Sequence, residues 1–509
     1  MRSPDSPPHE VGPGDGGSGE RVHHQVTFLV LALATLAYAM LQSLVNPVLP
    51  TIQRHLHTTQ ANVTWVLTAY LLAASIATPV VGRAGDIVGK KKALVAVLVF
   101  LAAGTVLAAV APTIGVMIVA RLVQGAGGAL LPLAFGIVRD EFPRKDVARA
   151  VGTIAALIAV GGGLGIVLAG PIVDSLGYRY LFWIPLVIVV VALIAAVMVV
   201  PESKTRAPGR LSAGPAILLT LWLVAVLIAV SEASNWGWGS GRTLGLLALG
   251  LALVPVWVLA ESRSADPVVD MKMMRVPVVA TTNLAALLLG IPMYSVMAFL
   301  PEFVQTPRSS GYGFGASITA SGLFLLPLTA VMFFFGLWSG RLADRYGSKP
   351  VLIAGAVLTA ASCGMLTFAH HQRWEIYVAT AVVGAGLGFS FSAMSNLIVE
   401  SVPVTQVGVA SGMNANIRTI GGSIGAAVTG TIITSGMSGA GTPLEAGYTH
   451  AFLFLFIAAA GTAGASLLIP GAGRLATPSP IGTGAAGGTV LVHNAEAAII
   501  AGAPIVEAE

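Results

Sequence analysis

Charge and cysteine are the two features that this sequence has least of. Only 10% of its 509 residues are Asp, Glu, Lys or Arg, whereas 55% are hydrophobic. Soluble domains carry about 25% charged residues, so the composition excludes a water-soluble globular protein. The single cysteine, Cys363, lies in an apolar run, which excludes an intramolecular disulfide and a cysteine-based metal site.

The sequence also lacks complete signatures of nucleotide-binding or zinc-dependent catalysis. The stretch GDIVGKKK has three residues rather than four between its glycines and no Ser or Thr after the lysine, so it is not a Walker phosphate loop. The stretch from Gly384 to Gly388 lacks the final glycine of a dinucleotide fingerprint, and no His-Glu-x-x-His pattern occurs. We therefore expect no enzyme activity, no cofactor and no bound metal.

Long apolar runs, in contrast, recur along the whole chain. The hydrocarbon core of a bilayer is about 30 Å thick, and about 20 apolar residues in a helix cross it. Helices satisfy their own backbone hydrogen bonds in lipid, so the runs predict an all-α integral membrane protein. Fourteen spans are expected, at about 26–48, 62–82, 93–112, 114–138, 149–172, 180–200, 211–231, 243–260, 277–301, 316–339, 350–369, 376–398, 408–434 and 449–470.

Basic residues are distributed unevenly among the expected loops. Twenty Lys and Arg residues fall in loops on one side of the spans and five on the other. Cytoplasmic loops are enriched in Lys and Arg, so we expect the first side, with both termini, to face the cytoplasm of a cell membrane. The same scatter through short loops explains the net charge of +5 and argues against a nucleic-acid partner.

Two short stretches between apolar runs share one pattern, GRAGDIVGKKK at 82–92 and GRLADRYGSKP at 340–350. Glycine permits tight turns, and aspartate pairs with nearby cations, so each stretch predicts a short charged loop between two spans. A basic loop that only anchors its spans in the cytoplasm is the alternative. The shared positions are Gly82, Asp86, Gly89 and Lys90 in the first copy, and Gly340, Asp344 and Gly347 in the second.

The two halves of the chain align with each other at a nearly constant offset, which indicates a duplicated six-helix unit. The glycines that recur 260 positions later are Gly152, Gly161, Gly162, Gly165 and Gly170, which match Gly412, Gly421, Gly422, Gly425 and Gly430. The expected organisation is a disordered cytoplasmic tail at 1–25, a six-helix bundle at 26–200, an inserted pair of spans within 201–276, a second six-helix bundle at 277–470 and a cytoplasmic tail at 471–509.

The repeated loop resembles the motif between the second and third helices of the major facilitator superfamily, and the inserted pair resembles that family's fourteen-span drug:proton antiporters. The resemblance implies two six-helix bundles plus two inserted helices. It also implies a charge lock between Asp86 and Lys90, echoed at Asp344, that breaks when the transporter changes its open side. Arg121, in ARLVQGAGGALLP, matches the family's fourth-helix arginine, which is held to influence proton movement.

The fifth expected span resembles the family's antiporter motif, in which small residues allow close helix approach and a pliable hinge. The proline that the family has after the third glycine is replaced by Ile166. The first span departs further, because Leu41 stands where the family often has an aspartate that helps proton coupling. The residues that match the antiporter motif are Gly152, Gly161, Gly165 and Gly170, with a Gly-Pro pair completed by Pro171.

Two arginines, Arg121 and Arg418, lie well inside expected spans. A charge at the bilayer centre costs about 2.5–3.5 kcal/mol on insertion scales, so such a residue is a functional candidate. The alternative is that each arginine orders the bundle by bonding neighbouring helices. Polar candidates for lining a substrate cavity are Gln42, Asn46, Gln124, Asn414 and Arg418, with Tyr70, Trp65, Tyr294 and Phe299 as weaker aromatic candidates.

Glu302 is the candidate carboxylate for proton coupling, in addition to the candidate arginine Arg121. Glu302 follows a helix break expected at Pro301, and closure of the protein could desolvate its carboxyl. The other carboxylates at span ends are interpreted as solvated anchors, and the histidines of the external loops as surface residues. These are Asp140, Glu141, Asp174 and Glu232 among the acids, and His55, His57, His370 and His371 among the histidines.

The pattern as a whole favours proton-coupled secondary active efflux of amphipathic organic compounds, cationic or neutral, by a monomer that alternates between two open sides. The expected partners are a small-molecule substrate, protons and the lipid bilayer. A proton-coupled importer or a narrow metabolite exporter on the same fold is one alternative. A receptor without transport is another, although a bundle that does not move has little use for two switch loops.

Overall fold

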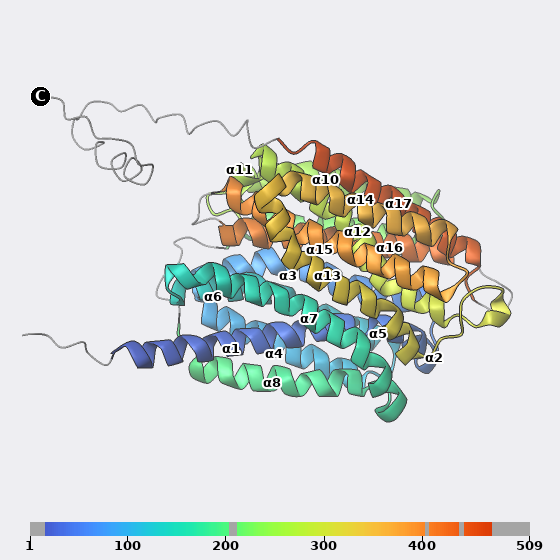
Figure 1. Ribbon diagram of the computed structural model, residues 1–509, viewed down its shortest axis with the longest axis horizontal. Helices are drawn as coiled ribbons and strands as arrows, with labels where there is room; N and C mark the ends of the chain where they lie inside the picture. Colours follow the sequence, from blue (N-terminus) through green and yellow to red (C-terminus); the bar gives the residue numbers. More distant parts are fainter. Residues whose placement is uncertain (1–15, 203–210, 403–406, 437–441, 471–509) are drawn as a thin grey trace, which may run out of the picture. The chain divides into compact units, whose positions relative to one another are not determined.

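The computed structural model describes residues 16–202, 211–402, 407–436 and 442–470, and nearly all regular structure there is helical (Figure 1). The first half contains α1 (Gly16–Ser43), η1 (Asn46–Val48), α2 (Leu49–His55), α3 (Gln60–Val88), α4 (Lys90–Val110), α5 (Ile114–Gln124), η2 (Gly125–Ala129), α6 (Leu130–Glu141), α7 (Arg144–Leu176) and α8 (Tyr180–Val199). Then follow α9 (Ala213–Trp236), α10 (Gly241–Arg263) and α11 (Met271–Met274). The second half contains α12 (Pro277–Gln305), η3 (Arg308–Ser310), α13 (Ile318–Tyr346), α14 (Ser348–Phe368), α15 (Arg373–Ser401), α16 (Val407–Thr434) and α17 (Glu445–Leu467).

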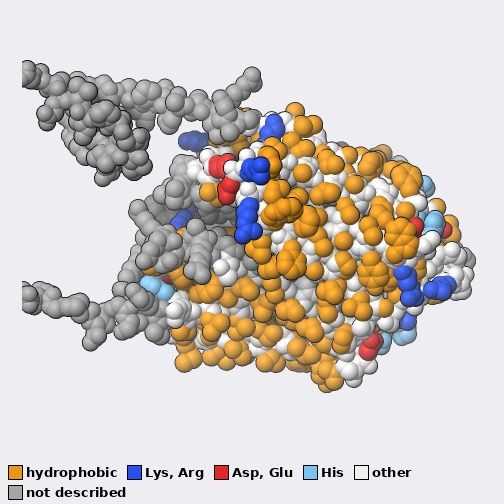
Figure 2. Space-filling model, in the orientation of Figure 1, with side chains coloured by type: hydrophobic (Ala, Val, Ile, Leu, Met, Phe, Trp, Pro, Cys, Tyr) orange, Lys and Arg blue, Asp and Glu red, His pale blue; other side chains and the backbone are white. Residues whose placement is uncertain are grey.

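Twelve of the described helical segments are long and apolar enough to cross a membrane. Hydrophobic side chains cover most of the visible face, and charged side chains gather toward its ends (Figure 2). The all-α membrane fold is therefore confirmed. Two further predicted spans coincide with α7 and α16, which are 33 and 28 residues long but are not among the twelve, so the count of fourteen stays a prediction there.

The predicted tails and loop boundaries differ in detail from the structure. Helix α1 begins at Gly16, inside the predicted N-terminal tail; residues 1–15 and 471–509 lie outside the described ranges. Helix α3 runs on through Gly82 to Val88, and α4 begins at Lys90, so Gly89 alone separates them.

Only the second glycine of each motif copy makes a turn. Gly89 has a φ of 120° and Gly347 a φ of 85°, which L side chains rarely adopt and glycine adopts without strain. Gly82 and Gly340 lie inside α3 and α13, so the prediction of a turn at the first glycine was wrong.

Each half packs its own helices together, and two helix pairs connect the halves (Figure 1). In the first half α1 packs against α7 and α8, and α3 against α5; in the second, α12 packs against α16, and α15 against α13 and α14. The halves meet where α7 packs on α13 and α3 on α16. Helices α9 and α10 pack on each other, and α9 also contacts α16 and α3.

Glycines of α7 and α16 make the same contacts in the two halves. Gly161 and Gly165 face backbone atoms of α1, and their counterparts Gly421 and Gly425 face backbone atoms of α12. A Cβ at any of these four positions would come within 3.0 Å of a backbone atom, so only glycine permits the observed helix spacing. The duplication seen in the sequence is thus repeated in the packing.

The last glycine of each series contacts the opposite half instead. Gly170 lies against Thr319 of α13, and Gly430 lies against Thr64 of α3. Pro171, which follows Gly170, is inside α7 and does not end it. Gly152 also lies in α7. We call the end of the molecule with Gly170 and Gly430 the far end, and the end with Gly89 and Gly347 the loop end.

Substituting Gly170 tests this packing. A valine there would place its Cβ on backbone atoms of Thr319, so Gly170→Val should destabilise this conformation by about 1–3 kcal/mol, the usual cost of overpacking. The matched control is Gly464→Val in α17, where a Cβ meets nothing within 4 Å. Thermal unfolding in detergent should show a lower midpoint for Gly170→Val than for the control, and equal midpoints would contradict the packing.

Candidate functional site

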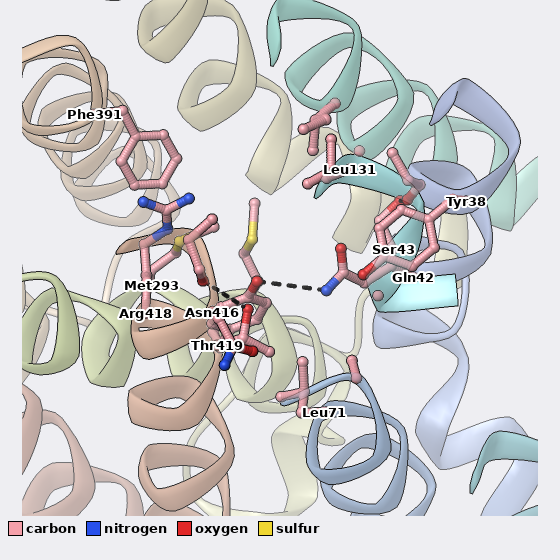
Figure 3. A pocket seen from close by; sticks show the side chains of 18 of the residues that line it. Tyr38, Gln42, Ser43, Leu71, Leu131, Met293, Phe391, Asn416, Arg418 and Thr419 are labelled. Atoms are coloured by element: carbon pink, nitrogen blue, oxygen red, sulfur yellow. Dashed lines mark hydrogen bonds between the residues drawn. The ribbon is translucent and has the colours of Figure 1, made fainter. Parts of the chain in front are cut away.

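A cavity of about 460 Å³ lies between the two halves. Helices α1, α3, α5, α6 and α7 line it on one side, and α12, α13, α15 and α16 on the other (Figure 3). Its volume falls within the roughly 300–1,000 Å³ of small-molecule sites. Most of its wall is apolar or aromatic, and representative residues are Leu71, Leu131, Met293, Met297, Phe333 and Phe391.

Polar side chains from both halves face each other across this cavity. The Gln42 amide of α1 donates a hydrogen bond of 3.5 Å to the Tyr294 hydroxyl of α12, which is the long limit for such a bond. Figure 3 shows Tyr38, Gln42 and Ser43 on one wall, opposite Asn416, Arg418 and Thr419. A bound molecule would therefore contact amide and hydroxyl groups from both halves at once.

Arg121 is fully buried and connects α5 to two other helices directly and to a third through Gln124. Its Nε donates to the Val66 carbonyl of α3 at 3.0 Å, and one terminal nitrogen donates to the Leu41 carbonyl of α1 at 3.3 Å. The same nitrogen donates to Gln124 at 2.8 Å, and Gln124 in turn donates to Thr105 of α4. The backbone of Leu41 thus supplies an acceptor where the family often has an aspartate.

The guanidinium of Arg121 also stacks on an aromatic ring. Its Cζ lies 4.1 Å from the centroid of the Tyr70 ring, a cation–π contact. The second terminal nitrogen is buried and forms no hydrogen bond with the described residues. Arg121 is among the residues around the cavity, so its positive charge lies beside any molecule bound there.

Arg418 contributes a second positive charge from α16. Its Cζ stacks 4.2 Å above the Phe391 ring of α15, and the side chain is half-buried and faces the cavity (Figure 3). The described residues that line the cavity include no Asp or Glu. The cavity therefore carries positive charge that no lining carboxylate balances.

The predicted cavity residues fall into two groups. Gln42, Asn46 and Arg418 line the cavity, as do the aromatic candidates Tyr70 and Tyr294. The other candidates lie outside the lining. These are Gln124, which bonds Arg121; Asn414, which donates to Asn283 at 2.9 Å; Trp65, which donates to Glu232; and Phe299, which is in the core.

Asn416 also lines the cavity, although the sequence pattern did not indicate it. Asn414 stands one helical turn before Arg418, which predicts a shared face, but the glycines of α16 set which face packs on α12. That packing turns Asn414 toward Asn283 and leaves Asn416 beside the cavity. The helical spacing alone could not distinguish the two asparagines.

The first motif loop centres on a buried lysine. Lys90 is 4% exposed and lies 3.4 Å from Asp86 and 2.7 Å from Asp140, which is at the end of α6. Asp140, interpreted from sequence as a solvated anchor, is therefore the closer carboxylate partner of Lys90. In the second copy Asp344 is exposed, whereas Lys349 donates to the carbonyls of Leu467 and Ile469.

Glu302 is buried near the far end of α12. One carboxyl oxygen accepts a hydrogen bond of 2.7 Å from the Tyr448 hydroxyl of α17, and the other has no hydrogen-bond partner among the described residues. The carboxyl is desolvated, as expected, although the helix break predicted at Pro301 is absent because α12 continues to Gln305. Prolines inside membrane helices are tolerated in this way.

The far end is closed by contacts between the halves. Thr319 of α13 donates to Asp174 of α7 at 2.7 Å, and Gln305 of α12 donates to the Pro47 carbonyl at 2.6 Å. The cavity wall extends away from these contacts toward the loop end, where Leu337 lies close in sequence to the second motif. The cavity is therefore separated from the far end by packed helices.

Replacing Arg121 by lysine keeps the positive charge but removes the planar guanidinium, which donates to the carbonyls of both Val66 and Leu41. Hydrogen bonds to charged groups contribute about 1.5–3 kcal/mol each, so Arg121→Lys should lower the unfolding midpoint clearly. Arg54→Lys, at an exposed arginine that bonds only its own helix, is the control and should change the midpoint little. If Arg121→Lys and Arg54→Lys were both as stable as the unsubstituted protein, an organising role for Arg121 would be excluded.

Comparison with known proteins identifies the family. A profile of the Major Facilitator Superfamily matches residues 31–426 and 282–500. The chain is 29% identical over 423 residues to the tetracenomycin C resistance and export protein of Streptomyces glaucescens, covering 82% of this chain and 77% of that protein. It is 26% identical over 376 residues to the multidrug transporter protein MdtP of Bacillus subtilis, covering 73% and 68%.

The fold agrees with this assignment. The crystal structure of a D-xylose-proton symporter superimposes with a TM-score of 0.62 at 15% identity, covering 87% of this chain and 97% of that one. A likeness at this identity shows the fold alone. The profile, the relatives and the fold agree: the chain belongs to the Major Facilitator Superfamily and is a multi-pass membrane transporter.

Proposed function

We propose that this transporter exports amphipathic organic compounds in exchange for protons by alternating access. The observation that carries the proposal is the cavity between the halves, which has apolar walls, few polar groups and a closed far end. The named activities of the relatives, tetracenomycin C export and multidrug transport, support export over import. The alignment covers most of the chain, so the relatives share the helices that form the cavity.

The observed conformation supports a state in which the cavity opens toward the loop end. Helices α7 and α3 seal the far end against α13 and α16 through Gly170 and Gly430, while the cavity wall continues toward the motif loops. Basic residues concentrated in those loops support placing the loop end, and both termini, in the cytoplasm. A substrate would then enter from the cytoplasm and leave after the far end opens.

The charge of the cavity favours neutral or acidic aromatic substrates over cations. Arg121 and Arg418 are the charged residues among its described lining, and a cation would have no carboxylate to pair with. The planar guanidinium of Arg418 can pair with a carboxylate or phenolate, and the surrounding methionines and aromatics suit flat apolar rings. The sequence predicted cationic or neutral substrates, and the charge of the cavity favours the neutral ones and adds acidic ones.

Glu302 is the proposed proton carrier. Its carboxyl is buried near the far end and accepts one hydrogen bond, from Tyr448, so opening of the far end would change the surroundings of this carboxyl. Arg121 would influence the same process through the electrostatic field of the cavity. Protons moving inward under the membrane potential would supply about 2.3 kcal/mol per charge per 100 mV.

The test of coupled transport uses purified protein in proteoliposomes with an internal pH dye. With an imposed pH gradient, carboxyfluorescein, an acidic aromatic, should give proton movement that depends on the added compound, and ethidium, a cationic one, should give less. If neither of these compounds, nor a neutral polyaromatic antibiotic, produced proton movement, coupled export of this substrate class would be contradicted.

Replacing the carboxyl of Glu302 by an amide of the same shape tests the proton site. Glu302→Gln should abolish substrate-dependent proton movement and flatten the pH dependence of export, because a side-chain amide does not take up and release a proton as a carboxyl does. Glu232→Gln, which alters a half-buried carboxylate bonded to Trp65 and Asn235, is the control. Unchanged coupling in Glu302→Gln would move the proton site elsewhere.

Neutralising Arg418 tests the substrate class. Arg418→Gln should raise the KM for the acidic dye about tenfold or more, the effect of losing one charge-assisted hydrogen bond, while the KM for the cationic dye falls or stays constant. Arg308→Gln, on an exposed residue outside the cavity, is the control. A similar loss for both dyes would mean that Arg418 has a structural role.

A further inference from the structure

A cluster of two histidines and one glutamate lies at the far end, outside the cavity. His370 and His371 connect α14 to α15, and Glu445 is the first residue of α17. The Nε2 of His370 is 3.1 Å, and the Nδ1 of His371 3.6 Å, from one oxygen of Glu445. All three ligand atoms lie within 4.8 Å of one another. Both histidines were predicted to be surface residues, and this is wrong for His370, which is only 4% exposed.

The hydrogen bonds of His370 fix its protonation pattern. Its Nδ1 is 2.7 Å from the Leu366 carbonyl oxygen, and a carbonyl only accepts, so the proton is on Nδ1. In the neutral ring Nε2 then carries a lone pair that points at a carboxylate oxygen 3.1 Å away. Two lone pairs at this distance repel each other unless a cation lies between them or Nε2 is itself protonated.

A divalent metal ion satisfies this arrangement. Zinc binds His nitrogen at about 2.0–2.1 Å and carboxylate oxygen at about 2.0–2.2 Å, so neighbouring ligand atoms in a tetrahedral site stand roughly 3.3 Å apart. The distances from the Glu445 oxygen to His370 Nε2 and His371 Nδ1, 3.1 and 3.6 Å, bracket this value. A carbonyl bond to Nδ1 is also the second-shell contact that orients metal-bound histidines.

We propose that His370, His371 and Glu445 bind one divalent transition-metal ion of the zinc type, with solvent in the fourth position. Imidazole and carboxylate ligands suit such ions. His371 is 70% exposed on its side chain, so the site is open to the solution at the far end. The ion would fasten the α14–α15 connection to the start of α17.

The site lies close to the contacts around Glu302. Tyr448, which donates to Glu302, stands one turn after Glu445 on α17. Phe303 packs edge-on against both His370 and Tyr448, with ring centroids 5.4 and 5.3 Å away. A bound ion would therefore hold the helix end that positions Tyr448. This consequence rests on the proposed function, whereas the metal site itself does not.

The test measures zinc binding directly, in full-length protein purified in detergent without a polyhistidine tag. Isothermal titration with ZnCl₂ after chelator treatment should show a site at one ion per chain, and zinc at a hundredfold excess over Kd should raise the unfolding temperature by about 3 °C. His371→Asn should weaken this binding at least about tenfold. Folding of this variant is not at issue, because the side chain is exposed.

The matched control is His57→Asn, which removes another exposed histidine outside the cluster and should leave zinc affinity unchanged. Glu445→Gln provides a second variant and should weaken binding as His371→Asn does. If the unsubstituted protein binds no zinc, or if both cluster variants bind it as tightly as the control, the proposal is overturned. Proton transport is not needed for either readout, so failure of the proposed transport function would leave this result unaffected.

Discussion

Close backbone contact between helices, possible only at glycine, is the constraint on which the rest of this structure depends. Gly161 and Gly165 bring α7 onto α1, and Gly421 and Gly425 bring α16 onto α12. Without a hydrophobic driving force between helices in lipid, such packing supplies much of the association energy. It creates two halves with similar internal packing, with Gly170 and Gly430 at their shared contact.

The buried charges follow from the same arrangement. Helices packed this closely give the Arg121 guanidinium carbonyl oxygens from α1 and α3 in place of a carboxylate. The positive charge therefore remains uncompensated beside the cavity, as does that of Arg418 on the opposite wall. Under the proposed function, such a cavity would select substrates by apolar surface and by the absence of positive charge. Glu302, the proposed proton carrier, is not among the residues that line the cavity.

The sequence predicted the fold because the patterns that indicate it either repeat along the chain or involve residues close together in sequence. The constant offset between glycines indicated the duplication, and the helical spacing placed Gln124 beside Arg121, where the two bond at 2.8 Å. Contacts between residues distant in sequence left no such signal. Asp140 reaches Lys90 across 50 positions, and His370 is buried by Phe303 and Phe452. The choice between Asn414 and Asn416 depended on helix rotation, which spacing does not determine.

The central claim is that the far end opens while the two halves keep their internal packing. The direct measurement is the distance between spin labels on Ser175→Cys and Ser309→Cys, exposed positions on opposite halves at this end, in a Cys363→Ser background in proteoliposomes. Electron-electron double resonance should give a short distance at rest and a second, longer distance when pH and substrate are varied. One unchanged distance under all conditions, in protein that still exports substrate, would contradict the account.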